Sequence, residues 1–147
     1  MFNIKHPATG LKVEIGIPDG TGEVFGTSEL LGHKERISGY FIGKNSSARY
    51  EYDFGDSWVH TVKLEKILPA APGEKYPKCI GGKMACPPED CGGIYGYYDL
   101  LSALSDPKNE EHEEMIEWLG RKIDPERFDP EAASFDDPKW RWKQRFE

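Results

Sequence analysis

The chain has 147 residues, 37% of them hydrophobic and 31% charged, which suits one globular domain and is short for two. No apolar run approaches the roughly 20 residues of a membrane-spanning helix, and no signal-peptide core is visible. We therefore expect a cytoplasmic protein, in which stable disulfides are rare. The net charge of −7 opposes non-specific binding of nucleic acid by the whole surface.

The first third of the chain predicts short strands. Apolar and polar residues alternate over 11–17, a period of two that is typical of a half-buried strand. Residues 2–4 predict the end of a preceding strand, and 18–27, rich in Gly, Asp and Thr, predict a surface loop. Ser28 followed by 29–36 predicts a short helix with a serine cap.

The clearest local signal is a β-hairpin over 49–68. Polar and apolar residues alternate on both sides of Gly55-Asp56-Ser57, and these three residues are of the types typical of a tight turn. On the second strand, His60 shares a face with Trp58 and Val62. We therefore expect an antiparallel pair at the centre of a sheet.

After the hairpin the pattern changes to loops and helices. A loop over 76–95 is rich in Gly and Pro and contains all three cysteines. Helical spacing of leucines predicts a helix over 97–105, and Asp106-Pro107 predicts the start of a second helix, 107–119. Strands first and helices last favour the α+β class. We expect one domain, 1–147, with an antiparallel sheet built around the hairpin and packed by two C-terminal helices.

Three long segments of the chain carry a family resemblance. They are Tyr50–Pro69, Tyr76–Leu101 and Glu110–Glu131, in this order, and they resemble the plasmid pRiA4b ORF-3-like family. The resemblance implies a small α+β protein from a family of mostly uncharacterised members. It also implies an association with mobile elements, because some members accompany insertion elements.

Two features depart from the family pattern. Members usually begin with a further strand and helix, and nothing before Met1 supplies these elements, so we expect a shortened member or a start at an internal Met. A missing strand would expose a sheet edge, so we expect self-association or a protein partner there. The basic and aromatic tail, 136–147, is also outside the pattern.

The cysteine loop is the first candidate site. Cys79, Cys86 and Cys91 could supply three thiolate ligands to zinc. His60 could supply a fourth ligand, with Glu89 or Asp90 as alternatives. The spacing lacks the close Cys pairs of typical zinc sites, so a redox pair, a disulfide and inert buried thiols stay open as alternatives.

The acidic residues near the hairpin and the loop form two smaller candidates. Asp53 and Asp56, with His60, could bind a divalent metal or perform acid–base chemistry, although Asp and Gly are also ordinary turn residues. Glu89 and Asp90 would repel phosphate, and we expect them to support the loop by accepting backbone hydrogen bonds.

The tail is the last candidate, as a contact for nucleic acid or a partner. If the tail is extended, its cations lie on one side and its tryptophans on the other, a pattern that can stack bases and contact phosphates. The alternative is that the aromatic residues dock on the protein's own sheet. The residues concerned are Lys139, Trp140, Arg141, Trp142, Lys143 and Arg145.

No complete catalytic constellation is visible in the sequence. The first hypothesis is therefore a non-enzymatic binding module associated with mobile elements. The alternative is a zinc-dependent enzyme, hydrolytic in type, or a domain with a purely structural metal.

Overall fold

The computed structural model describes residues 1–17, 28–121 and 123–146. The chain divides into two compact units, the first formed by Met1–Pro69 with Asp90–Ser102 and the second by Ala70–Glu89 with Ala103–Glu147. The backbone therefore passes from one unit to the other three times. Within the described residues, no helix is long and apolar enough to span a membrane.

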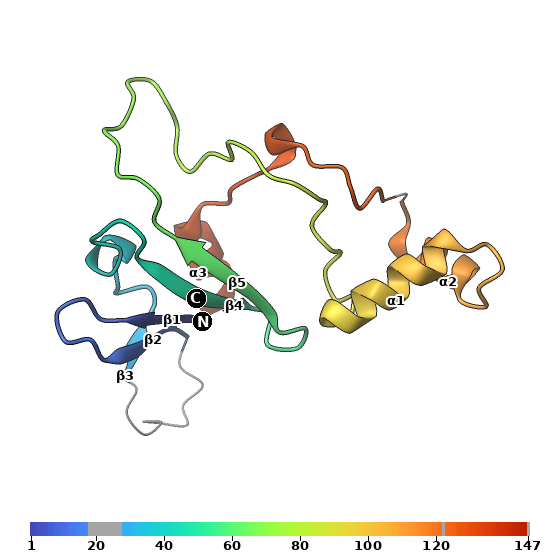
Figure 1. Cartoon of the computed structure of the whole chain (residues 1–147), viewed down its shortest axis with the longest axis horizontal. Coiled ribbons are helices and arrows are strands. Elements are labelled where there is room, and N and C mark those ends of the chain that lie inside the picture. The colour runs from blue at the N-terminus through green and yellow to red at the C-terminus, as the bar shows by residue number, and fades with distance from the viewer. Residues whose placement is uncertain (18–27, 122, 147) are drawn as a thin grey trace. The chain divides into compact units, whose positions relative to one another are not determined.

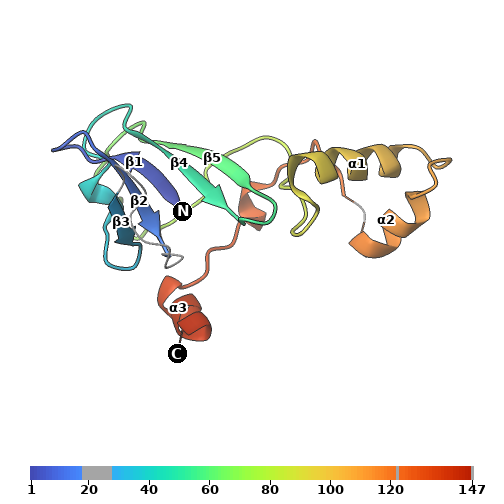
Figure 2. The same cartoon turned by 90° about the horizontal axis from the view of Figure 1, so that it is seen from below.

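The first unit is built on a five-stranded sheet with the order β3-β2-β1-β4-β5 (Figures 1 and 2). The β2–β3 pair is parallel and the other pairs are antiparallel. Helices follow the strands along the chain, which confirms the predicted α+β class. The strands are β1 (Phe2–Lys5), β2 (Lys12–Gly16), β3 (Ser28–Leu31), β4 (Ser47–Tyr52) and β5 (Trp58–Lys63).

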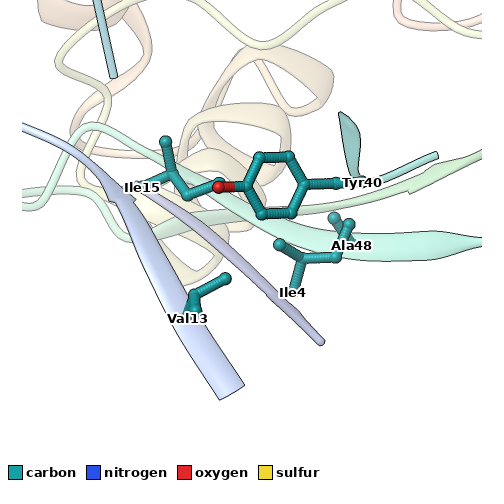
Figure 3. Packing of buried hydrophobic residues seen from close by; sticks show 5 residues of the cluster. All are labelled: Ile4, Val13, Ile15, Tyr40 and Ala48. Carbon is teal, nitrogen blue, oxygen red and sulfur yellow. The ribbon is translucent and has the colours of Figure 1, made fainter. Parts of the chain in front are cut away.

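One face of the sheet forms the hydrophobic core of the first unit. Alternate residues of β1, β2 and β4 point to this face, and the ring of Tyr40 lies against them (Figure 3). Each buried aliphatic side chain contributes roughly 1.5–3 kcal/mol relative to an exposed one. The cluster consists of Ile4, Val13, Ile15, Tyr40 and Ala48.

The predicted hairpin is confirmed as β4 and β5. The two strands pair in register from Ser47↔Lys63 to Tyr52↔Trp58, which makes β5 the outer strand on this side of the sheet. The turn between them contains two non-glycine residues with left-handed backbones, Asp53 with a φ of 54° and Ser57 with a φ of 53°.

The predicted helix over 29–36, capped by Ser28, is wrong. Ser28–Leu31 forms β3, which pairs with β2 in the register Glu14↔Glu29. The Gly32 amide continues this pairing by donating to the Gly16 carbonyl at 2.7 Å. Pairing with a distant strand outweighs a weak local helix preference. The predicted loop over 18–27 lies outside the described residues.

Both predicted central helices exist, with different starts. Helix α1 spans Gly93–Ser105, four residues earlier than expected, and α2 spans His112–Leu119, five residues later. The segment before α2 is held in turns, because the Asp106 and Asn109 side chains accept backbone hydrogen bonds from two residues onward, each at 2.9 Å. Gly120 ends α2 in the left-handed conformation, as expected.

In the second unit, short turns open at Asp-Pro pairs. The carboxylates of Asp124, Asp129 and Asp137 each accept the backbone N–H two residues onward, at 2.8–3.0 Å. Two of these turns lead into helical segments, a 3₁₀ turn at Pro130–Ala132 and helix α3 at Pro138–Phe146. Asp side chains therefore satisfy the amides that a helix start leaves unpaired.

Candidate functional site

The two carboxylates of the hairpin tip act as hydrogen-bond acceptors. Asp53 Oδ1 accepts the N–H groups of Gly55 at 2.9 Å and Asp56 at 3.4 Å, which holds the turn closed. Asp56 Oδ2 accepts the N–H of Gly92 at 3.2 Å, 36 residues later in the chain. Both carboxylates therefore stabilise the hairpin tip by accepting backbone hydrogen bonds. A metal-binding or acid–base role for them stays a prediction.

Glycines allow the hairpin tip to approach the start of α1 closely. A Cβ on Gly93 would overlap the carbonyl oxygen of Asp56, and one on Gly96 would overlap that of Cys91. Gly93 also has a left-handed φ of 68°. Only glycine fits both the conformation and the contact. Gly93 and Gly96 thus allow α1 to begin directly beside the hairpin tip.

His60 does not lie in the core. It is exposed on β5, and its ring lies 5.7 Å from that of Tyr50, its cross-strand partner. Tyr50 in turn stacks on Phe2, with ring centroids 4.4 Å apart. Three aromatic rings therefore cross three neighbouring strands, and cross-strand pairs of this kind stabilise a sheet.

The four predicted zinc ligands are divided between the two units. Cys79 and Cys86 belong to the second unit, and Cys91 and His60 belong to the first. Within the described residues, no group of three or more His, Cys, Asp or Glu side chains is gathered as a metal site, and no disulfide joins the three cysteines. The four-ligand zinc site therefore stays a prediction.

The cysteine loop is ordered by contacts within each unit. In the second unit, the Ala85 amide donates to the Pro125 carbonyl at 2.9 Å. Gly82 lies under the ring of Phe128, where a Cβ would meet the ring. Asp90 has a left-handed φ of 56°, which places it in the turn before α1. Loop support by Glu89 and Asp90 stays a prediction.

The tail is a helix, so the condition of an extended strip is not met. Residues two apart on a helix do not share a face, and the cations are therefore spread around α3. Arg141 forms an ion pair and a hydrogen bond with Asp136, and its amide bonds to the Asp137 carbonyl at 3.0 Å. Nucleic-acid or partner contact by these residues stays a prediction: Lys139, Trp140, Arg141, Trp142, Lys143 and Arg145.

Strand β5 presents one side of its backbone away from the sheet. Leu64, directly after the strand, donates its N–H to Ser46 at 2.8 Å and therefore faces β4. Because backbone direction alternates along a strand, the odd-numbered residues of β5 face outward. These residues are Val59, Thr61 and Lys63, and all three are exposed.

One hollow of the first unit was not expected from the sequence. It has a volume of about 660 Å³ and lies where β1 and β4 separate. Its lining includes three cationic side chains, those of Lys5, Lys12 and Arg49, and two core residues, Ile4 and Tyr40. Alternation in the sequence places each lysine on the polar face of its strand, but only the strand register brings them together.

Tyr40, which lines this hollow, has a perturbed hydroxyl. Burial of the phenol raises the pKa of Tyr40 to about 12, and the hydrogen bond that it donates to Glu35 at 2.7 Å adds to the increase. The hydroxyl therefore stays protonated across the physiological range. Tyr40 is a neutral donor held in place by a carboxylate.

Among solved structures, a protein of unknown function, MM3350 from Methanosarcina mazei Go1, is similar to this chain. The two are 43% identical and superimpose with a TM-score of 0.78, over 91% of this chain and 71% of the other. The uncharacterized protein y4hQ of Sinorhizobium fredii (strain NBRC 101917 / NGR234) is 43% identical over 89 residues. This match covers 60% of the chain and 43% of the relative, so the chain spans less than half of that relative's length.

The resemblance carried by the hairpin, the cysteine loop and the glutamate-rich helix extends further than those segments. The model of one protein family, described as plasmid pRiA4b ORF-3-like protein, matches residues 9–132. The match ends before the first residue of α3. The chain belongs to the plasmid pRiA4b ORF-3-like family.

Proposed function

We propose that the chain is a non-enzymatic interaction module that binds an extended segment of a protein partner along β5. The observation that supports this function is the outward-facing backbone of Val59, Thr61 and Lys63, on the outer strand of the sheet. An added strand gains main-chain hydrogen bonds from such an edge. The family takes its description from a plasmid reading frame, which supports an association with mobile elements. We place this activity in the cytoplasm.

The alternating side chains of β5 define the partner's chemistry. One face of the strand carries Trp58, His60 and Val62, and the other carries the three edge residues. A partner strand that adds here places apolar residues beside Trp58 and Val62 and polar residues beside Thr61. Lys63 favours an acidic residue at its end of the partner segment.

The test removes one outward N–H without touching the β4–β5 pairing. Thr61→Pro lacks the donor and places a ring at the edge, whereas Thr61→Ala keeps the donor and serves as the matched control. We expect selection from a random dodecapeptide display library to yield alternating apolar–polar peptides. These should bind the wild type and the alanine variant and bind the proline variant at least about tenfold more weakly.

Equal binding by the proline variant, with an unchanged circular dichroism spectrum, would refute a role for the β5 edge. Peptides without alternation would do the same. A second copy of the chain is the other possible occupant of this edge. Sedimentation equilibrium distinguishes the two occupants. A wild-type dimer that dissociates in Thr61→Pro would show that the β5 edge binds a second copy of the chain and not a different protein.

A metal-dependent enzyme or a structural zinc is the second candidate. It is supported by three cysteines without a disulfide in a loop that leads into α1. Elemental analysis of untagged protein tests it. Stoichiometric zinc that is lost in Cys79→Ser and Cys86→Ser would support the site, and protein without zinc that binds none on titration would remove it.

A further inference from the structure

The polar face of the sheet carries a cluster of cations that the strand register assembles. Lys5 and Lys12 are direct cross-strand partners on β1 and β2. Their neighbours Ile4 and Val13 are buried in the core, so the two lysines lie on the opposite face. Both lysines are exposed.

This arrangement costs stability unless an anion compensates for it. Like charges directly opposite each other on neighbouring strands repel. Among the residues that the structure describes, neither lysine forms an ion pair. Arg49, on β4, is 3.3 Å from Glu51 and is therefore partly neutralised. Glu14 lies on the same face, two residues from Lys12 and opposite Asn3, but among the described residues it forms no ion pair with either lysine, so Lys5 and Lys12 remain unpaired cations on an acidic chain.

The same place is hollowed because the strands part. The pairing of β1 with β4 includes Phe2↔Tyr50 and ends at Asn3↔Arg49, although β1 continues to Lys5 and β4 begins at Ser47. The hollow of about 660 Å³ opens beyond the last pair. This volume lies within the range of about 300–1,000 Å³ that is typical of small-molecule sites.

The lining of the hollow combines two kinds of surface. Three cations and the neutral donors Asn3 and Ser47 offer hydrogen bonds to an anion, whereas Ile4 and the ring of Tyr40 offer apolar contact. The Ser46 hydroxyl also lines the hollow but is occupied by the backbone of Gly43, at 2.7 Å and 3.2 Å.

We propose that this hollow binds a small phosphorylated ligand with a ring-shaped part, of the size of a nucleoside monophosphate. The phosphate contacts Lys5, Lys12 and Arg49, and the ring contacts Tyr40 and Ile4. Bound phosphate places negative charge between the two lysines and removes their repulsion. This site is independent of the β5 edge, so Thr61→Pro leaves it intact.

The experiment titrates the full chain with three probes in an isothermal calorimeter. Adenosine monophosphate tests the whole site, adenosine tests the ring contact alone, and inorganic phosphate tests the anion contact alone. We expect the monophosphate to bind at least about tenfold more tightly than either of the others, and its affinity to fall as salt is added. A monophosphate that binds no better than adenosine would overturn the proposal, as would the absence of binding.

Charge-neutral variants separate a binding role from a structural one. Lys5→Gln and Lys12→Gln should each weaken monophosphate binding about tenfold. The same variants should raise the urea midpoint slightly, because they relieve the repulsion. Lys34→Gln is the control, since Lys34 is an exposed lysine of the same unit outside the hollow. Unchanged binding in the first two variants, or equal weakening in the control, would contradict the proposal.

Discussion

The two units of the chain differ in the interactions that hold each of them together. In the first unit, cross-strand pairs join residues far apart in sequence, as where the Met1 amino group donates to the Glu51 carbonyl at 2.8 Å. In the second unit, the Asp-Pro turns bond residues only two apart, and the backbone hydrogen bond from Ala85 to Pro125 adds a link across 40 residues. Among its described residues, Ala103 is the only buried apolar side chain, whereas the first unit buries a connected cluster.

This difference predicts how far the destabilising effect of a substitution extends through each unit. A change in the first unit disturbs several strands at once, because they share one core and unfold cooperatively. A change at an Asp-Pro turn removes a local bond and leaves the sheet alone. The following predictions test this contrast, beginning with the largest expected effect.

Gly93→Ala should destabilise the first unit by about 4 kcal/mol, because its Cβ would meet the Asp56 carbonyl and its backbone is left-handed. Gly10→Ala is the matched control. Gly10 has a similar φ of 70°, but nothing lies within 4 Å of its Cβ, so it should lose only about 1 kcal/mol. Urea unfolding measures both, and equal losses would mean that close contact with the hairpin tip is unimportant.

Ile15→Ala should cost about 3 kcal/mol, because it empties part of the shared core. In the second unit, Ile116→Ala on α2 removes a side chain that is 46% exposed and should cost less than about 1 kcal/mol. Thermal unfolding followed by far-ultraviolet circular dichroism compares the two variants. A larger loss of stability in Ile116→Ala than in Ile15→Ala would contradict the view that buried apolar side chains stabilise the first unit more than the second.

Tyr40 should make the first unit sensitive to high pH. The pKa of Tyr40 is about 12 in the folded protein and exceeds the ordinary value of about 10. The neutral phenol therefore contributes fully to the free energy of unfolding below pH 10, and this contribution is lost as the pH rises towards 12. About 2 kcal/mol should disappear over this interval. Tyr40→Phe should lack this component, and urea midpoints from pH 8 to 12 measure it. Parallel profiles for the two proteins would contradict the prediction.

Asp137→Ala should have the smallest effect, about 1 kcal/mol confined to α3, because it removes the acceptor of the Lys139 amide. Asp136→Ala is its control, since the Asp136 side chain forms an exposed ion pair with Arg141 and holds no helix-start amide among the described residues. Amide hydrogen exchange should quicken at the start of α3 in the first variant and stay unchanged in β1 and β4. Faster exchange in the sheet would break the contrast between the units.

The fold was predictable where its cause is local. Alternation over 11–17 and around Gly55 revealed β2 and the hairpin, since a period of two needs no knowledge of the partner strand. β3 was missed because Ser28–Leu31 is short and its parallel partner lies across an intervening segment. The sequence places the start of α2 too early because it does not show that Asp106 holds a separate turn before the helix.

The candidate sites were predictable only in part for the same reason. The sequence identifies Asp56 as a turn residue but cannot show that Gly92 donates to it from 36 residues away. It also cannot show that Lys5 opposes Lys12, because this depends on register. Nor can the sequence show that His112 Nδ1 donates to the Ala103 carbonyl, at 2.8 Å.

The threefold passage of the backbone between the units has a practical consequence for fragments of the protein. A protease cut within 70–89 would separate β1–β5 from α1, although the first unit draws on both pieces. The amino-terminal fragment would lack Leu100, which is only 3% exposed in the intact chain. Neither fragment should therefore fold into the complete first unit alone. The two fragments of the cleaved chain should have to associate to restore it.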